Sequence, residues 1–191
     1  IKILGLTKFA VRLPMAIISC VSIIAMYYLL KNIFNKKIAT IGVIFLAICP
    51  WHIMKARYGL ESNIFPNVVL FAILFMTLGI KKYKMSIFYL GWALIGLSTY
   101  AYGTSYFFVT IFSIITIPFL LIKKEIKFKN AFIAILIAIV IASPIIIMIL
   151  INTFDLPEIK FLGFTIPRLF INRFEGNCSI FSSNFILNSI N

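Results

Sequence analysis

Residues 131–151 read AFIAILIAIVIASPIIIMILI, and this stretch decides the class of fold. None of these side chains is charged. A helix of this length extends about 30 Å at about 1.5 Å per residue, which matches the hydrocarbon core of a bilayer. In lipid the backbone polar groups must pair within the segment itself. The stretch therefore predicts a transmembrane helix.

Five more apolar segments precede it, and each is long enough to be a predicted span: residues 13–30, 38–54, 64–80, 85–102 and 103–122. The chain is 62% hydrophobic and only 12% charged, with a mean hydropathy of +1.09. A soluble domain is about one quarter charged, so a soluble fold is excluded. We predict an all-α, polytopic transmembrane bundle of about six spans. Residues 1–151 would form the membrane module and residues 152–191 an extracytoplasmic loop segment.

The net charge of +13 indicates membrane topology rather than a nucleic-acid partner, because the basic residues lie in short clusters between apolar runs. Lysine clusters follow the first, third and fifth predicted spans: Lys31, Lys36 and Lys37; Lys81, Lys82 and Lys84; Lys123, Lys124, Lys127 and Lys129. The second span is followed only by Lys55 and Arg57, and the fourth by no basic residue. The positive-inside rule places the lysine clusters in the cytoplasm. The loops after the second and fourth spans are then extracytoplasmic.

The outer end of the second span carries the ionisable residues that could do chemistry: His52, Lys55, Arg57 and Glu61. Ionisable groups near the membrane are expensive to bury and usually face a cavity or a partner. In a helix Arg57 and Glu61 can pair, and an arginine fork matches phosphate oxygens. Glu61 could instead hold a divalent metal ion. From spacing alone, an interfacial loop with one surface ion pair is the simpler interpretation.

Several short motifs in order resemble the GT-C glycosyltransferases, closest to the protein O-mannosyltransferases and lipid A aminoarabinose transferases. They are Arg12-Leu13-Pro14, the turn at residues 29–37, and Pro50-Trp51-His52 followed by Arg57 and Glu61. The resemblance covers about residues 5–122. Cys49 stands where the family has Ser. Asn35 stands where the family has Gly, and we expect Asn35 to adopt the left-handed turn that Asn tolerates.

The resemblance implies a membrane enzyme that transfers a sugar from a polyprenyl-phosphate-linked donor to an acceptor outside the cytoplasm, in the plasma membrane of a bacterium. It implies that Arg57 and Glu61 bind the donor phosphate or a divalent metal ion, with His52 and Lys55 beside them. The main catalytic carboxylate of the family would lie before Ile1. We therefore expect no catalytic residue within the chain, and an inactive fragment of a longer enzyme.

Tyr100 and Tyr102, after the fourth span, could stack on a sugar, although an aromatic belt at the interface is the commoner role. Relatives often have Arg after such a turn, whereas this chain has Ser105 or Tyr106. A transporter or flippase of lipid-linked substrates and a non-catalytic scaffold stay open as alternatives. A transporter would need charges or helix breaks at mid-membrane. The predicted spans contain only Pro118 and Pro144 as internal breaks, which disfavours it.

Overall fold

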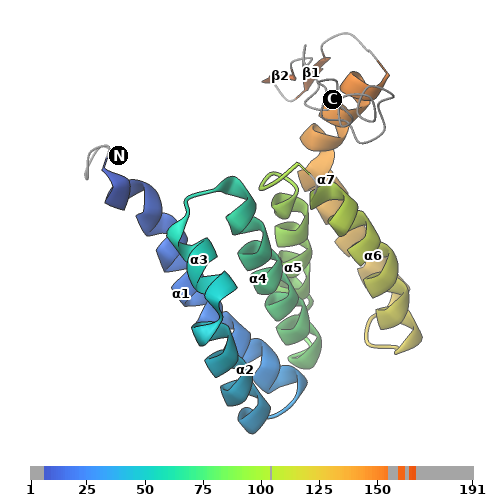
Figure 1. The fold of residues 1–191 in the computed structure, drawn as a ribbon. Coiled ribbons are helices and arrows are strands. Elements are labelled where there is room, and N and C mark those ends of the chain that lie inside the picture. The colour runs from blue at the N-terminus through green and yellow to red at the C-terminus, as the bar shows by residue number, and fades with distance from the viewer. Residues whose placement is uncertain (1–6, 104, 155–158, 162–163, 167–191) are drawn as a thin grey trace, which may run out of the picture. The chain divides into compact units, whose positions relative to one another are not determined.

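The computed structural model describes residues 7–103, 105–154, 159–161 and 164–166 (Figure 1). These residues form seven helices and one antiparallel hairpin: α1 (Lys8–Ile33), α2 (Lys36–Ile48), α3 (Pro50–Arg57), α4 (Glu61–Lys81), α5 (Met85–Ser98), α6 (Ser105–Ile122), α7 (Phe128–Thr153), β1 (Ile159–Phe161) and β2 (Phe164–Ile166). Apart from this hairpin of two three-residue strands, the regular structure is helical, which confirms the predicted all-α class. The chain divides into two compact units, Ile1–Ser143 and Pro144–Asn191.

Each of the six predicted apolar segments contains a helix. Among the described residues, four helices are long and apolar enough to cross a membrane, namely α1, α4, α6 and α7. The bent pair of α2 and α3 makes a fifth candidate, and α5 is a shorter apolar helix of 14 residues. A helical membrane bundle is thus confirmed. The number of crossings and the orientation of the loops stay predictions.

The second apolar segment is not one helix, because Pro50 interrupts it. The axes of α2 and α3 differ by 56°. Pro50 is the first residue of α3, where its missing N–H is not needed. Its ring also disfavours the helical region for the residue before it, and Cys49 is extended, with φ −63° and ψ 116°. The prediction of a continuous helix over residues 38–54 was therefore wrong.

Two further expectations from the sequence need correction. Pro118 and Pro144 are not the only prolines inside helices, since α4 contains Pro66 and α1 contains Pro14. Asn35 is not left-handed, because its backbone is extended, with φ −144° and ψ 172°. Instead it caps α2, and its side-chain oxygen accepts a hydrogen bond from the Ile38 N–H at 2.9 Å.

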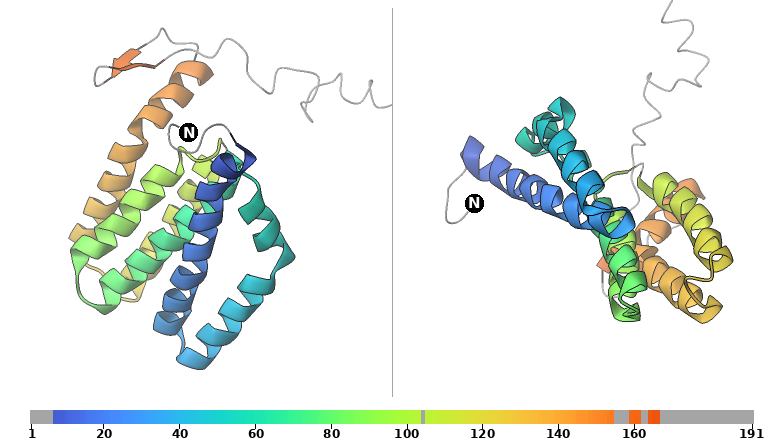
Figure 2. Two further views of the ribbon diagram at one scale, coloured as in Figure 1. Left: turned by 90° about the vertical axis from the view of Figure 1, so that its left-hand side faces the viewer. Right: turned by 90° about the horizontal axis from the view of Figure 1, so that it is seen from below.

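Helices α4 and α5 pack closely because glycines lie at their contact (Figures 1 and 2). A Cβ added at Gly79 of α4 would lie 2.4 Å from the backbone nitrogen of Phe88. A Cβ added at Gly91 of α5 would lie 2.7 Å from the carbonyl oxygen of Ala72. Phe88 and Trp92 are fully buried beside this contact. Lipid supplies no hydrophobic force between helices, so such close van der Waals contact is what holds them together.

The turns after α4 and α6 end their helices in the same way. Tyr83 has φ 53° and Lys124 has φ 55°, both in the left-handed region. The next residue after Tyr83 donates its N–H to the Gly79 carbonyl at 2.9 Å, and Tyr83 donates to Ile80 at 3.2 Å. This is a Schellman motif, which usually has Gly at the left-handed position. Both turns therefore hold a side chain in a conformation that glycine would adopt more easily.

Helix α1 lies against α2, α3 and α4 and is the element around which the candidate site is built (Figure 2). Its first turn is capped by Thr7, whose side chain accepts a hydrogen bond from the Ala10 N–H at 3.2 Å. On the face toward α4, Ala25 and Leu29 are buried with Leu74. Arg12 lies in the second turn of the same helix.

Candidate functional site

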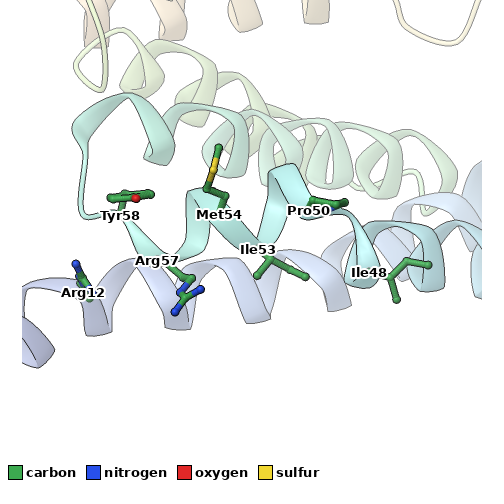
Figure 3. A pocket seen from close by; sticks show the side chains of 7 residues that line it. All are labelled: Arg12, Ile48, Pro50, Ile53, Met54, Arg57 and Tyr58. Atoms are coloured by element: carbon green, nitrogen blue, oxygen red, sulfur yellow. The ribbon is translucent and has the colours of Figure 1, made fainter.

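An open pocket of about 580 Å³ lies where α1 meets the bent α2–α3 segment (Figure 3). Two arginines, a tyrosine and an apolar wall surround it: Arg12, Arg57, Tyr58, Ile48, Pro50, Ile53 and Met54. The bend at Pro50 shapes this pocket, because α3 leaves the direction of α2 there. The pocket is amphipathic, with two cationic groups beside aliphatic side chains.

The two arginines reach the pocket from different helices. Arg12 lies in the second turn of α1, and Arg57 is the last residue of α3. Figure 3 shows the Arg57 side chain extending from α3 toward α1. Both residues are exposed, and neither has a hydrogen-bond or ionic partner among the side chains that the structure describes. Each carries a permanent positive charge on a planar guanidinium group, which suits an anionic ligand.

Glu61, the predicted partner of Arg57, begins α4, but its side chain lies outside the described residues. The ion pair between Arg57 and Glu61 stays a prediction. Within the described part of the chain no three His, Cys, Asp or Glu side chains form a group that could hold a metal ion. The divalent ion at Glu61 stays a prediction.

Polar side chains from α1 and α4 hold α3 in place. His52 Nε2 lies 3.3 Å from the Ser22 hydroxyl, which donates its own proton to the Ser19 carbonyl at 2.7 Å. With that proton engaged, the arrangement assigns the Nε2–H of His52 as the donor to Ser22. At the other end of α3, Asn63 Nδ2 donates to the carbonyls of Lys55 and Tyr58 at 3.2 and 3.0 Å. Each end of α3 thus has a polar link to a neighbouring helix.

A model of the dolichyl-phosphate-mannose-protein mannosyltransferase family matches residues 1–148. The chain belongs to this family. Comparison with curated proteins and with solved structures gave no match. Membership confirms the resemblance to GT-C transferases and makes the chain an integral membrane glycosyltransferase of the mannosyltransferase type, whose family uses a lipid-linked sugar donor.

Among the predicted site residues whose side chains the structure describes, only Arg57 lines the pocket. His52 contacts Ser22, and Lys55 places its Nζ 4.9 Å from the centre of the Trp51 ring. Tyr100 lies in the turn after α5 and donates its hydroxyl proton to the Ile141 carbonyl of α7 at 2.8 Å. Tyr102 lies in the same turn, where its carbonyl accepts from Ser105, and neither tyrosine lines this pocket. Their predicted contacts with substrate stay untested.

Sequence reasoning missed three residues of this region. Arg12 was read as part of a motif at the start of a span and not as a ligand-binding side chain. Tyr58 carried no signal beside the charged residues around it. Asn63 was overlooked within an apolar segment, although a buried amide in such a segment must find partners and for that reason indicates a structural or functional contact.

Proposed function

We propose that this chain binds a polyprenyl-phosphate-linked sugar with its phosphate between Arg12 and Arg57 and serves transfer of the sugar to an extracytoplasmic acceptor. The observation that carries the proposal is that two guanidinium groups, neither with a partner among the described side chains, line one pocket together with an apolar wall. A polyprenyl phosphate has an anionic head joined directly to an aliphatic chain. The arginines match the head, and Ile48, Ile53 and Met54 match the chain.

The proposed chemistry is a displacement at the anomeric carbon of the sugar. A nucleophile of the acceptor forms the new bond there while its proton passes to a general base. The bond between the anomeric carbon and the phosphate oxygen breaks, and its electron pair stays on the phosphate, which gains one negative charge. Arg12 and Arg57 stabilise that charge as it develops, so they favour the transition state over the bound donor.

Other groups keep supporting roles in this proposal. The described residues that line the pocket include neither a carboxylate nor an imidazole, and the proposal assigns the general base to none of them. Glu61, four positions after Arg57, would orient the Arg57 side chain or hold a divalent ion. Tyr100 and Tyr102 would contact the sugar at the outer surface. We also propose that the membrane is the plasma membrane of a bacterium and that the active face is extracytoplasmic.

Phosphate-specific binding tests the proposal. The chain in nanodiscs would be titrated with undecaprenyl phosphate and, as a neutral control, with undecaprenol. Arg57→Lys and Arg12→Lys keep the charge but lose the planar fork. Each should weaken binding of the phosphate by about ten-fold while binding of undecaprenol stays unchanged. Lys82→Ala, which removes a charge from the exposed turn after α4, should leave both affinities unchanged.

Equal affinity of the unmodified chain for undecaprenyl phosphate and undecaprenol would contradict the proposed role of the pocket. So would loss of phosphate binding in Lys82→Ala to the same extent as in Arg57→Lys, because charge alone would then explain it.

A flippase of lipid-linked substrates is the second candidate, since the 56° break between α2 and α3 is a feature that transporters use at their substrate sites. Family membership favours the transferase. Liposomes that contain the chain and a fluorescent polyprenyl-phosphate sugar, without acceptor, separate the two. A flippase would move the lipid between leaflets, whereas a transferase would leave its distribution unchanged.

A further inference from the structure

Helix α3 carries Arg57 but is too short to hold a direction alone. It has eight residues, and helices of this length are marginal in isolation. Its last residue is Arg57, and Tyr58 is already extended, with φ −105° and ψ 122°. The Lys55 carbonyl accepts a hydrogen bond from the Tyr58 N–H at 3.4 Å, and the other carbonyls at such an end need partners from outside the helix. The orientation of Arg57 therefore depends on what binds the backbone at the end of α3.

Asn63 supplies two side-chain hydrogen bonds that link this end to α4, beside the local bond from the Tyr58 N–H to the Lys55 carbonyl at 3.4 Å. Its amide nitrogen donates one hydrogen to the carbonyl of Lys55 at 3.2 Å and the other to the carbonyl of Tyr58 at 3.0 Å. These two carbonyls lie on either side of Arg57 along the chain. Both protons of one side chain thus hold the backbone before and after Arg57.

Asn63 is itself firmly placed. It lies in the first turn of α4, the helix that packs on α1 and α5, and only 4% of it is exposed. Its own N–H donates to the Leu60 carbonyl at 3.0 Å. Arg12 lies on α1, so α4 connects the backbone around Arg57 to the helix that carries the opposite arginine. The relative position of the two guanidinium groups follows from this connection.

We propose that Asn63 is a positioning residue that fixes the end of α3 and so directs Arg57 into the pocket opposite Arg12. The proposal rests on the proposed binding of a lipid phosphate by Arg57. Asn67 provides a matched control. It is also a buried asparagine of α4, but its amide donates to the Asn63 carbonyl of the same helix at 3.0 Å and does not reach α3.

The first measurement needs no ligand. Trypsin cleaves after arginine, and cleavage after Arg57 requires the end of α3 to open. In detergent, Asn63→Ala should increase the rate of cleavage after Arg57 by about ten-fold, because two hydrogen bonds are lost, while Asn67→Ala leaves it unchanged. The fragment that ends at Arg57 is quantified by mass spectrometry. An unchanged rate in Asn63→Ala would overturn the proposal.

The second measurement connects Asn63 to the phosphate. Asn63→Ala should weaken binding of undecaprenyl phosphate by about ten-fold and leave binding of undecaprenol unchanged. In an Arg57→Ala background the same substitution should have no further effect, because it acts through Arg57. An independent, additive loss in that background would overturn the positioning role.

Two provisions keep the outcomes distinct. If thermal unfolding shows that Asn63→Ala does not fold, both measurements are made on Asn63→Ser instead. The serine hydroxyl can donate to a nearby backbone carbonyl, whereas the link to α3 is lost. If the unmodified chain shows no preference for undecaprenyl phosphate over undecaprenol, the proposed function fails, and the cleavage rates still decide whether Asn63 fixes the end of α3.

Discussion

Replacing Gly91 with alanine should separate α4 from α5. The new Cβ would lie 2.7 Å from the Ala72 carbonyl oxygen, 2.9 Å from the Met76 backbone nitrogen and 2.5 Å from Met76 Cγ. The first two are backbone atoms of α4 and cannot rotate away. Restoring an ordinary contact of 3.4 Å to the carbonyl oxygen requires a local shift of 3.4 − 2.7 = 0.7 Å.

A shift of that size is expensive at this place. A gap of about 0.5–1 Å removes roughly a quarter to a half of the attraction between facing atoms. Phe88 and Trp92, both fully buried beside Gly91, would lose contact with α4. Overpacking of this kind destabilises by about 1–3 kcal/mol. We therefore expect Gly91→Ala to lower the free energy of unfolding by about that amount.

Gly42→Ala is the matched control. Gly42 also lies in the middle of an apolar helix, but the atoms near its added Cβ belong only to the Leu30 side chain, with Cδ1 at 2.4 Å. That side chain can rotate, so the change should stay within about 0.5 kcal/mol. The helix propensity gained from Gly to Ala is common to both variants and cancels in the comparison.

The assay is reversible unfolding in mixed micelles of mild detergent and dodecyl sulfate, followed by circular dichroism. The two variants are compared with the unmodified chain under identical conditions. Equal stability of Gly91→Ala and Gly42→Ala would refute the reasoning, because α4 and α5 could not then be in backbone contact at Gly91.

Tyr83→Gly should stabilise the chain by about 1 kcal/mol, because glycine adopts the left-handed backbone conformation of this residue without strain and the lost side chain is 89% exposed. Tyr83→Ala should not stabilise it, and thermal unfolding distinguishes the two variants. In a background without native cysteines, an impermeant thiol reagent should label Gly103→Cys but not Tyr83→Cys in intact cells. The lysines that flank Tyr83 place its turn in the cytoplasm, out of reach of the reagent. The opposite labelling pattern would mean that the orientation is reversed. Ser22→Ala and His52→Ala should be non-additive in unfolding free energy by about 1 kcal/mol, because they share one hydrogen bond; strict additivity would exclude that bond.

The amino-acid sequence by itself determined the class of fold and the environment. An uncharged apolar stretch such as residues 131–151 can satisfy its backbone in lipid only as a helix, so composition and length are sufficient to predict it. The sequence also drew attention to Arg57, because a charge at the end of an apolar segment needs a partner or a cavity. The ordered motifs around it indicated the family that the comparison confirmed.

The break before α3 depended on tertiary structure, because proline has no single effect on a helix. Pro66, Pro118 and Pro144 all remain inside helices, whereas the helix breaks at Pro50. The ring and the missing N–H are the same at all four prolines. What differs at Pro50 is that α3 finds polar partners on α1 and α4 after it turns, and these contacts link residues far apart in the sequence.

The pocket was likewise decided only by packing. Arg12 and Arg57 meet because α1 lies against α3, and no spacing rule relates two residues on separate helices. Asn63 carried no motif, yet its two amide protons reach the carbonyls on either side of Arg57. Hydrogen bonds between side chains and distant backbone groups depend on the positions of whole helices. Those positions are set by close contacts such as the one at Gly91, which local sequence patterns do not reveal.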